Sequence, residues 1–234
     1  MNAPSPIRHT LLDACGVIHG FGVRGSAAPA GCVRPRQMHG VAVMTARPDA
    51  GEGMEEADAI VSDVAGLPVA VVTADCVPLL VAELGGARVA AIHAGWRGLA
   101  AGVVTAGLAA LEHAGATPAR LRAVIGPYIG PCCYEVDEPV VSALGARFGA
   151  AAGAALRLVR PGHVLLDLGL LVREECLRAG LSPQAVASVE GTCTCCDVAR
   201  FHSFRRDGER AGRLLHFLAA RCPLPEVRDG PSES

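Results

Sequence analysis

Two histidines and one cysteine, in three separate motifs, are the residues of this sequence best suited to chemistry. His39 lies in Gln-Met-His-Gly, Cys76 in Thr-Ala-Asp-Cys-Val-Pro, and His93 in Ile-His-Ala-Gly-Trp-Arg-Gly. Imidazole nitrogens and a thiolate sulfur are ligands that zinc prefers, and three protein ligands leave a fourth position for water or substrate. The pattern predicts a catalytic metal site, with zinc as the expected ion and copper as the other candidate.

Small residues and a carboxylate surround these ligands. Asp75 directly precedes Cys76, and Gly40, Gly95 and Gly98 allow the backbone to approach closely at the same places. A charged residue beside the thiol is costly in an apolar core, so the surroundings indicate a site. We expect Cys76 and His93 to take part in catalysis, with Asp75 as the carboxylate that moves protons.

Arginine residues supply the expected anion site. The chain contains no lysine, and all 21 basic residues are arginine, which excludes a Schiff-base lysine and a phosphate-loop lysine. The residues after His93 open a predicted helix whose free N–H groups favour an anion, and Arg97 adds a charge there. We also expect Arg205 and Arg206 to bind phosphate or carboxylate. The alternative for these two is a solvated helix start capped by Asp207.

The segment 125–136, Ile-Gly-Pro-Tyr-Ile-Gly-Pro-Cys-Cys-Tyr-Glu-Val, is rich in turn residues between a predicted strand and a predicted helix. Loops of this kind commonly line a site. We expect Tyr134 to contact a substrate ring or a ribose hydroxyl, with Tyr128 and Glu135 as further candidates. The alternative is a buried crossover loop with Tyr134 in the core.

Ten segments have the composition of strands and four have helical periodicity. The expected strands are 16–23, 41–45, 59–62, 69–73, 79–83, 88–93, 121–125, 164–167, 186–189 and 201–205. The expected helices are 96–113, 138–148, 168–179 and 207–221, and the Ala/Gly stretch 143–156 should be a helix end running into a loop. Strands dominate the first half and alternate with helices in the second, which predicts an α+β fold: a layered α/β domain with mixed β-sheets.

One predicted hairpin would bring two of the candidate ligands together. Strands 79–83 and 88–93 flank a turn signal at Leu84-Gly85-Gly86-Ala87. If they pair about this turn, His93 lies opposite Pro78, and Cys76 follows two residues beyond at the same sheet end. Antiparallel partners approach to about 4.5–5.5 Å, so a long sequence separation becomes a metal-bridging distance. His39 must arrive from the start of strand 41–45.

The composition narrows the class of protein. The 234 residues are 51% hydrophobic with a net charge of −2, which fits one well-packed domain over 1–234 and argues against a nucleic-acid or membrane partner. No apolar run is long enough to cross a bilayer, and the first residues lack the apolar core of a signal peptide, so we expect a cytoplasmic protein. The polar segment 223–234 should be a frayed tail.

The ten cysteines should remain mostly reduced in such a compartment. Cys15, Cys32, Cys176 and Cys222 stand singly and should be small core residues. The remaining clusters, Cys132-Cys133 and Cys193-Thr-Cys195-Cys196, have no neighbouring histidine and do not match a zinc-finger pattern. A second, cysteine-rich metal site is therefore the less favoured interpretation of the sequence.

Five motifs, in order between residues 20 and 213, resemble the YfiH family, also called the laccase-domain or polyphenol-oxidase-like family, in which some members are named peptidoglycan editing factor. They are Gln-Met-His-Gly, Thr-Ala-Asp-Cys-Val-Pro-Leu-Leu, Ala-Ile-His-Ala-Gly-Trp-Arg-Gly, Ile-Gly-Pro-Cys-Cys-Tyr-Glu-Val and Ser-Phe-Arg-Arg-Asp-Gly. The segment 22–36 is shorter here than the family's usual segment.

The resemblance implies a layered fold with mixed sheets, related to the catalytic domain of cytotoxic necrotizing factor. It implies a metal site at His39, Cys76 and His93. It also implies a purine nucleoside phosphorylase that acts on adenosine, inosine and methylthioadenosine with phosphate, and that has adenosine deaminase activity in the same site. An older family name implies a copper-dependent phenol oxidase.

Other functions remain open from the residues alone. Cys76 could be the nucleophile and His93 the base of a metal-free hydrolase or amidase, for example one acting on a cell-wall precursor. A copper phenol oxidase would use the same ligands, although true multicopper oxidases need many more histidines than the eight here. A zinc-stabilised binding protein without turnover is the remaining alternative.

Overall fold

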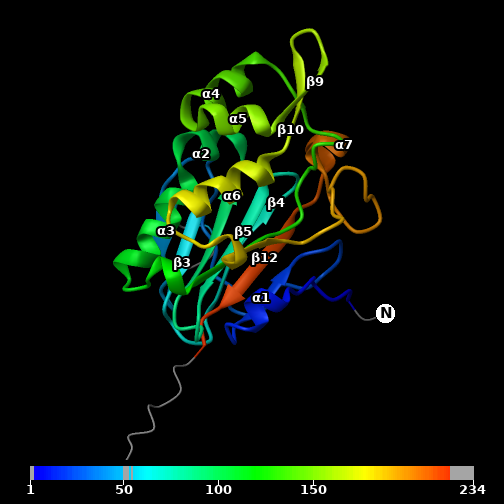
Figure 1. Cartoon of the computed structure of the whole chain (residues 1–234). Helices are drawn as coiled ribbons and strands as arrows, with labels where there is room; N and C mark the ends of the chain where they lie inside the picture. The colour runs from blue at the N-terminus through cyan, green and yellow to red at the C-terminus, as the bar shows by residue number, and fades with distance from the viewer. Residues whose placement is uncertain (1–2, 50–52, 54, 222–234) are drawn as a thin grey trace, which may run out of the picture.

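The structure is a computed structural model that describes residues 3–49, 53 and 55–221. Within these residues the strands form three sheets, the largest of which we call the central sheet (Figure 1). Its strand order is β11-β7-β5-β6-β3-β2. These strands are β2 (Val43–Thr45), β3 (Ala59–Ser62), β5 (Val77–Glu83), β6 (Val89–Ala94), β7 (Leu121–Ile125) and β11 (Val186–Ser188). The outer pairs β2·β3 and β7·β11 are parallel and the inner pairs are antiparallel, so the predicted mixed sheet is confirmed.

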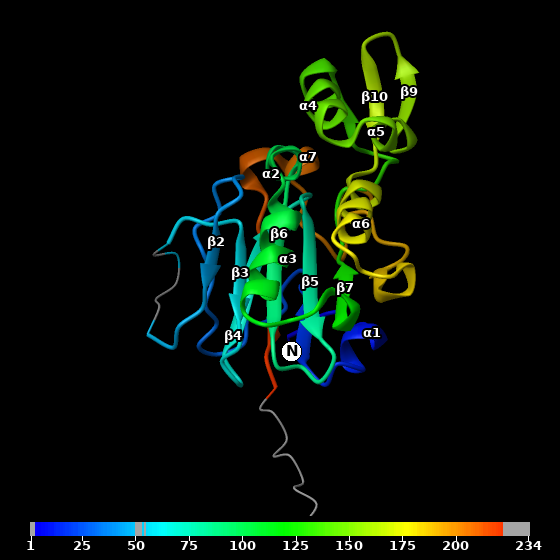
Figure 2. The same cartoon turned by 60° about the vertical axis from the view of Figure 1, so that its left-hand side comes forward.

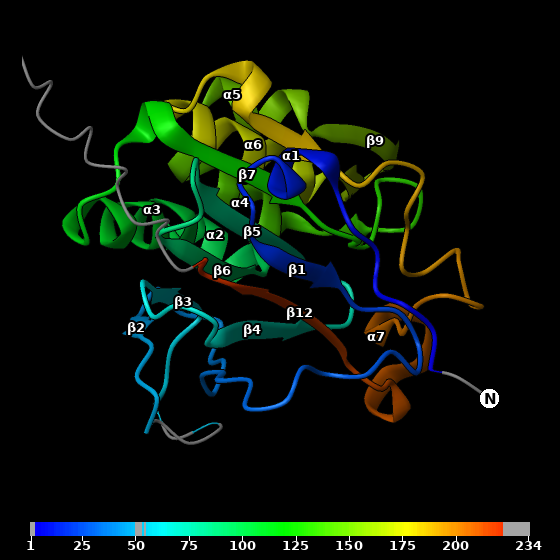
Figure 3. The same ribbon diagram turned by 90° about the horizontal axis from the view of Figure 1, so that it is seen from below.

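A second sheet, the back sheet, packs on one face of the central sheet. It has the order β1-β12-β4 and is antiparallel, with β1 (Ile18–Phe21), β4 (Pro68–Thr73) and β12 (Leu214–Ala219). Helices cover the opposite face of the central sheet, so the molecule has helix, sheet and sheet layers (Figure 3). The layered α/β fold expected from the sequence is therefore confirmed.

The helices that cover the central sheet include α2 (Trp96–Ala101), α3 (Val103–His113) and α6 (Leu168–Arg178), and α4 (Glu138–Phe148) packs against α2. A third, small sheet β8-β10-β9 stands with α4 and α5 (Ala150–Ala154) at one end of the molecule (Figure 2). Its strands are β8 (Glu135–Val136), β9 (Leu156–Arg160) and β10 (His163–Leu166). The remaining short elements are α1 (Thr10–Asp13), α7 (Phe204–Asp207) and the 3₁₀ helices η1 (Pro118–Arg120), η2 (Pro183–Ala185) and η3 (Gly208–Arg210).

Both faces of the central sheet are buried, which explains its nearly continuous apolar strands. Along β5, Leu79 and Val81 point to the core beneath the helices, whereas Leu80 and Ala82 point to the core beneath the back sheet. Successive side chains of a strand alternate between its faces, so a strand covered on both sides needs apolar residues throughout. The two cores pack against both faces of β5 and β6. They thereby fix the positions of Cys76, directly before β5, and His93, on β6.

The predicted hairpin has the expected register. β5 and β6 pair as antiparallel neighbours with Pro78 opposite His93, and the connecting turn contains Gly85 and Gly86, both with positive φ. Cys76 immediately precedes β5 at the same end of the sheet. The local pairing thus places a thiol and an imidazole together, as the sequence predicts.

The last third of the chain departs from the sequence prediction. The segment 201–205 is not a strand, because Ser203 caps the short helix α7 by accepting a hydrogen bond from the Arg206 N–H. The segment 207–221 is not a helix, because it contains η3 and then β12 in the middle of the back sheet. A short apolar run such as Leu-Leu-His-Phe-Leu-Ala has no periodicity that separates a buried strand from a buried helix.

Two smaller corrections concern glycine and alanine. The predicted helix 96–113 is interrupted at Gly102, whose φ of 100° lies in the left-handed region. The Ala/Gly stretch does not run into a loop, because α4 ends at Phe148 and the chain continues through α5 into β9.

Cys15 and Cys176 are buried in the core as predicted, and Cys32 is half-buried. The predicted frayed tail 223–234 and Cys222 lie outside the described residues.

Among the residues that the structure describes, no helix is both long and apolar enough to span a bilayer.

A buried histidine in the back sheet makes stability depend on pH. His216 is fully buried on β12, where its Nε2 lies 2.8 Å from the Thr73 hydroxyl, and its Nδ1 has no partner in the described part of the chain. Burial, together with the charge of His93, lowers the pKa of His216 to about 3. The folded protein therefore holds this imidazole neutral.

We predict acid destabilisation through His216. Because its pKa is lower in the folded state than the unfolded value of about 6.5, its contribution is complete above that pH and is lost as the pH falls from about 6.5 toward about 3. From about pH 7.5 to about pH 5 the free energy of unfolding in urea should fall by about 2 kcal/mol from this residue. His216→Gln should lose that part of the pH dependence. Exposed His113→Gln is the control, and an unchanged pH slope in His216→Gln would contradict the assignment.

Candidate functional site

The structure brings His39, Cys76 and His93 together at one end of the central sheet. Their ligand atoms all lie within 4.8 Å of one another, and the two imidazole rings meet edge to face with centroids 4.8 Å apart. His93 is buried on β6, Cys76 is half-buried in the turn before β5, and His39 is exposed in the loop before β2. Residues separated by 54 positions in the sequence thus form one group that could hold a metal ion.

Asp58, which the sequence analysis missed, orients two of these three ligands. Its Oδ1 lies 2.8 Å from His93 Nδ1, which leaves His93 Nε2 for a metal. The same carboxylate accepts hydrogen bonds from the backbone N–H groups of Met38, His39 and Gly40, at 3.1, 2.9 and 2.6 Å. His39 needs this support because its φ of 58° is in the left-handed region. Asp58 is nearly fully buried, whereas the sequence shows only an aspartate between Ala57 and Ala59 directly before the predicted strand 59–62.

The thiol and the buried imidazole change each other's protonation. Burial raises the pKa of Cys76, but hydrogen bonds from His39 and His93 and their charges outweigh burial and lower it to about 6. Burial lowers the pKa of His93, but Asp58 and Cys76 outweigh burial and raise it to about 9. Cys76 is therefore a thiolate at neutral pH, which is the form that binds metals and attacks electrophiles.

Glycines and a glutamine permit the close approach of the three ligands. A Cβ on Gly95 would lie 2.9 Å from His39 Nδ1 and 3.0 Å from Cys76 Sγ, so only glycine fits there. Gly98 is equally restricted, because a Cβ would lie 2.9 Å from the Gly40 carbonyl oxygen. Gln37 fixes the loop that carries His39 through paired hydrogen bonds to the Val72 backbone N–H and C=O, both of 2.7 Å.

Asp75 lies beside the ligands with its carboxylate fully engaged. Oδ1 accepts a hydrogen bond of 2.6 Å from the Thr194 hydroxyl. Oδ2 accepts hydrogen bonds from the Ser203 hydroxyl, at 3.1 Å, and from the Arg205 N–H, at 2.6 Å. Its φ of 97° is a strained conformation for a non-glycine residue. These contacts fix the turn before Cys76 and support a positioning role more directly than the proton transfer expected from the sequence.

The three ligands open into a cavity of about 710 Å³ with a strongly basic wall. Among the described residues, one aspartate and five arginines line it: Asp75, Arg34, Arg36, Arg97, Arg205 and Arg213. Trp96, Tyr134 and Phe204 add aromatic surface to the same wall. Such a cavity suits a ligand with an anionic part and a flat, apolar part. The short segment 22–36 contributes two of its arginines.

Arg97, Arg205 and Tyr134 all reach the cavity as expected. The Arg97 guanidinium lies 4.3 Å from the Trp96 ring centroid, and the Arg205 guanidinium lies 5.1 Å from that of Tyr134. Burial, and secondarily the charge of Cys76, raise the pKa of Tyr134 to about 12, so its hydroxyl stays a donor at neutral pH.

The structure does not bring Arg206, Tyr128 or Glu135 to this cavity. Arg206 donates to the carbonyl oxygens of Thr194 and Cys195, at 3.0 and 2.9 Å, and pairs with Asp207. The Tyr128 hydroxyl donates to Asp167 at 2.7 Å. The Glu135 carboxylate pairs with Arg160 and His163 on the small sheet. The adjacent residues Arg205 and Arg206 therefore point to different places, because α7 directs Arg205 but not Arg206 toward the cavity.

Comparisons with known proteins show which family and which solved structures this chain is similar to. A family model described as multi-copper polyphenol oxidoreductase laccase matches residues 23–221. A purine nucleoside phosphorylase from Xylella fastidiosa strain Temecula1 is 42% identical over 191 residues, which cover 80% of this chain and 71% of that protein. The adenosine deaminase RL5 from an unknown prokaryotic organism is 33% identical over 191 residues, which cover 78% and 72%. The crystal structure of YlmD from Geobacillus stearothermophilus superposes with a TM-score of 0.86 at 26% identity, over 95% of this chain and 98% of that one.

We predict that Asp58→Asn weakens metal binding without unfolding the protein. The amide removes the charge that holds His93 and the three N–H groups before β2, so the affinity for zinc should fall about 10–100-fold. Competition against a chromophoric chelator measures this change, and circular dichroism checks the fold. Asp63→Asn, an exposed aspartate just beyond β3, is the matched control. Equal zinc affinities of Asp58→Asn and the unaltered protein would contradict the role of Asp58.

Proposed function

This chain belongs to the family described as multi-copper polyphenol oxidoreductase laccase, and we propose that it is a metal-dependent purine nucleoside phosphorylase. We include adenosine, inosine and methylthioadenosine among its substrates, and adenosine deamination in the same site. The observation that carries the proposal is the His39, Cys76 and His93 group at the base of an arginine-lined cavity. The phosphorylase and deaminase names of the relatives support it.

Phosphorolysis needs a site that holds phosphate against a nucleoside. An oxygen of phosphate forms a bond to C1′ of the ribose while the bond from C1′ to the purine nitrogen breaks, and the purine leaves with those electrons and takes up a proton. Arg97 and Arg205 are suited to bind the phosphate, because guanidinium groups donate paired hydrogen bonds to its oxygens. The other arginines of the wall keep the cavity attractive to an anion.

The aromatic side chains provide the complementary half of the cavity. Trp96, Tyr134 and Phe204 offer flat surfaces against which a purine ring packs favourably. The Tyr134 hydroxyl, kept protonated by burial, can donate to a ribose hydroxyl or a ring nitrogen. These contacts with the nucleoside use aromatic rings and a hydroxyl group, so none of them requires a carboxylate. Among the described residues of the wall, Asp75 is the acidic one.

The donor set fits zinc, with copper as the alternative ion. His39, Cys76 and His93 would hold the ion as two imidazoles and one thiolate, with Asp58 behind His93. A bound zinc ion supplies a Lewis acid that activates water for deamination or polarises a substrate oxygen. Multicopper oxidases require several histidine-rich copper sites, which the described residues do not provide, so we do not favour phenol oxidation.

A metal-free cysteine hydrolase is the second candidate, because one observation favours it. Cys76, His93 and Asp58 form a thiolate, imidazole and carboxylate series, with the thiol pKa lowered to about 6. This is the order of groups in a nucleophile, base and orienting acid. However, His39 also lies next to the same sulfur, which suits a second metal ligand and which a hydrolase triad would not need.

The central experiment incubates the purified protein with adenosine, inosine or methylthioadenosine, with and without phosphate, and separates products by chromatography. We expect ribose 1-phosphate from inosine, or its methylthio analogue from methylthioadenosine, together with free purine, only when phosphate is present. Inosine formed from adenosine without phosphate would establish deamination. If none of the three nucleosides is converted by zinc-loaded protein, the proposed function is wrong.

Metal removal distinguishes the two candidates. Dialysis against a chelator should abolish phosphorolysis, and added zinc should restore it, if His39, Cys76 and His93 act through a metal. Full turnover in protein shown by elemental analysis to be metal-free would favour the cysteine hydrolase instead.

We predict that Arg205→Gln raises the KM for phosphate about 10–100-fold, the value of a charge-assisted hydrogen bond. The KM for inosine should change much less. The Arg205 backbone N–H that bonds to Asp75 is retained in this variant, so the turn before Cys76 stays in place. Arg210→Gln, which removes an exposed charge in η3 outside the cavity wall, is the control. An equal rise in both KM values would show that Arg205 does not act on phosphate in particular.

A further inference from the structure

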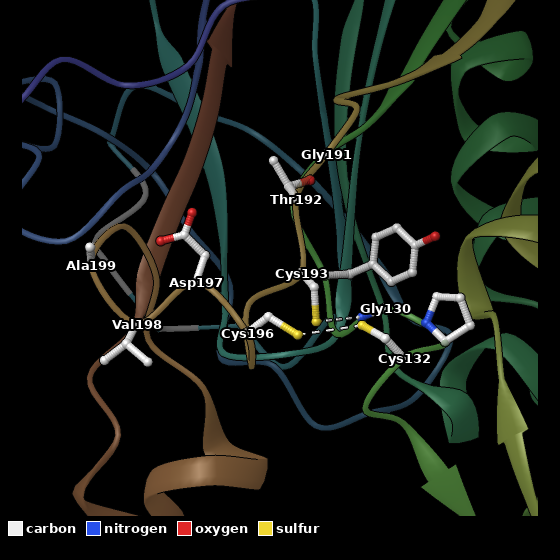
Figure 4. A pocket seen from close by; sticks show the side chains of 11 residues that line it. Gly130, Cys132, Gly191, Thr192, Cys193, Cys196, Asp197, Val198 and Ala199 are labelled. Atoms are coloured by element: carbon white, nitrogen blue, oxygen red, sulfur yellow. Dashed lines mark hydrogen bonds between the residues drawn. The ribbon is translucent and has the colours of Figure 1, made fainter.

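A second group of metal-ligating side chains lies outside the site described above. The Sγ atoms of Cys132, Cys133, Cys193 and Cys196 all lie within 4.8 Å of one another, and we call these residues the cysteine quartet. Cys196 Sγ is 3.5 Å from Cys132 Sγ and 3.2 Å from Cys133 Sγ. Figure 4 shows Cys132, Cys193 and Cys196 pointing toward a common centre between two loops.

These spacings fit one tetrahedral ion coordinated by four sulfurs. With zinc–sulfur bonds of about 2.3 Å, tetrahedral geometry places the sulfur atoms about 3.8 Å apart. The separations of 3.5 and 3.2 Å are slightly shorter than that value, all four sulfurs lie within 4.8 Å of one another, and these distances are far longer than the ~2.05 Å of a disulfide. An iron–sulfur cluster would need more room, because its thiolates bind several irons around a larger core.

The loop geometry is also that of a metal-binding turn. Cys193 and Cys196 have the Cys-x-x-Cys spacing of structural zinc sites, which is hidden in the sequence by the additional Cys195. The Gly130 N–H donates to Cys193 Sγ at 3.2 Å. A backbone N–H therefore faces the sulfur at this position, as commonly occurs around metal-bound thiolates.

The sulfurs need a cation among them to ionise together. Cys196 Sγ lies 3.2–3.5 Å from two other sulfurs, and negative charges so close together repel unless a cation lies among them. Two arginines already hold the surrounding backbone. Arg206 binds the Thr194 and Cys195 carbonyl oxygens, and Arg205 lies 3.5 Å from the Cys133 carbonyl oxygen.

We propose that the cysteine quartet binds one zinc ion as four thiolates, in a closed structural site separate from the three-ligand site at His39, Cys76 and His93. Binding releases the protons of those thiols that are not yet ionised, and no electron is transferred. Four protein ligands leave no position for substrate, in contrast to the three-ligand site.

The position of the quartet gives this zinc ion a clear structural consequence. It joins the loop that ends in Tyr134 to the loop that carries Thr194, and Thr194 donates directly to Asp75. Tyr128 and Cys193 already form a backbone bridge between the same loops. The ion would therefore lock the segments that position Asp75 beside Cys76 and Tyr134 in the cavity wall.

The test is the zinc content per chain, by elemental analysis and native mass spectrometry of protein produced with zinc. We expect two zinc ions in the unaltered protein, one in Cys193→Ser, one in Cys76→Ser and none in the double variant. Cys195→Ser, a thiol in the same loop but outside the quartet, should keep both ions. Because each variant removes one site, the zinc contents show separately whether the quartet binds zinc and whether the three-ligand site binds zinc.

Cobalt substitution identifies the ligands that remain. In Cys76→Ser, cobalt(II) should show the absorption of a tetrahedral four-sulfur site, and additional Cys193→Ser should abolish that absorption. If Cys193→Ser does not fold, alkylation of the unaltered protein replaces it. Exposed Cys132 and Cys196 should be protected in zinc-loaded protein and modified after chelation, as mapped by mass spectrometry.

Any one of the following results would overturn the proposal. The first is a zinc content of one in the unaltered protein that Cys193→Ser does not reduce. The second is a Cys132–Cys196 or Cys133–Cys196 disulfide in protein purified with zinc. The third is loss of the same ion in Cys195→Ser, or occupation of the quartet by copper or iron when zinc is supplied.

Discussion

The candidate site depends on one buried carboxylate, that of Asp58. It joins the start of β3, the imidazole of His93 on β6 and the loop that carries His39. A buried charge is costly unless every oxygen is paired, and here the hydrogen bonds that satisfy Asp58 are the same bonds that orient two ligands. Displacement of this carboxylate would release the left-handed backbone at His39 and free the His93 ring to rotate.

The parts of the site that follow from local pairing could be predicted from the sequence. The turn at Gly85-Gly86 fixes the β5·β6 register, and this register places His93 next to the turn that carries Cys76. The role of Asp58 could not be predicted, because its partners approach through tertiary packing of β3 against β6. The different directions of the Arg205 and Arg206 side chains could not be predicted either, because they depend on a single turn of helix that Ser203 caps.

The back sheet shows a different limit of sequence reasoning. β12 is central in its sheet and buried, so its apolar run lacks the alternation that would distinguish it from a helix. The error at 207–221 therefore has a physical origin in burial on both faces. The same burial keeps His216 neutral inside the protein and links the back sheet to acid sensitivity.

The placement of β12 also affects how the protein can fold during synthesis. β12 lies between β1 and β4, which are made much earlier, so both earlier strands have open edges until residues 214–219 have left the ribosome. Unpaired strand edges on a nascent chain readily associate with other chains. Closure of this sheet is thus a late, non-local event, because β12 must close long loops to both of its neighbours.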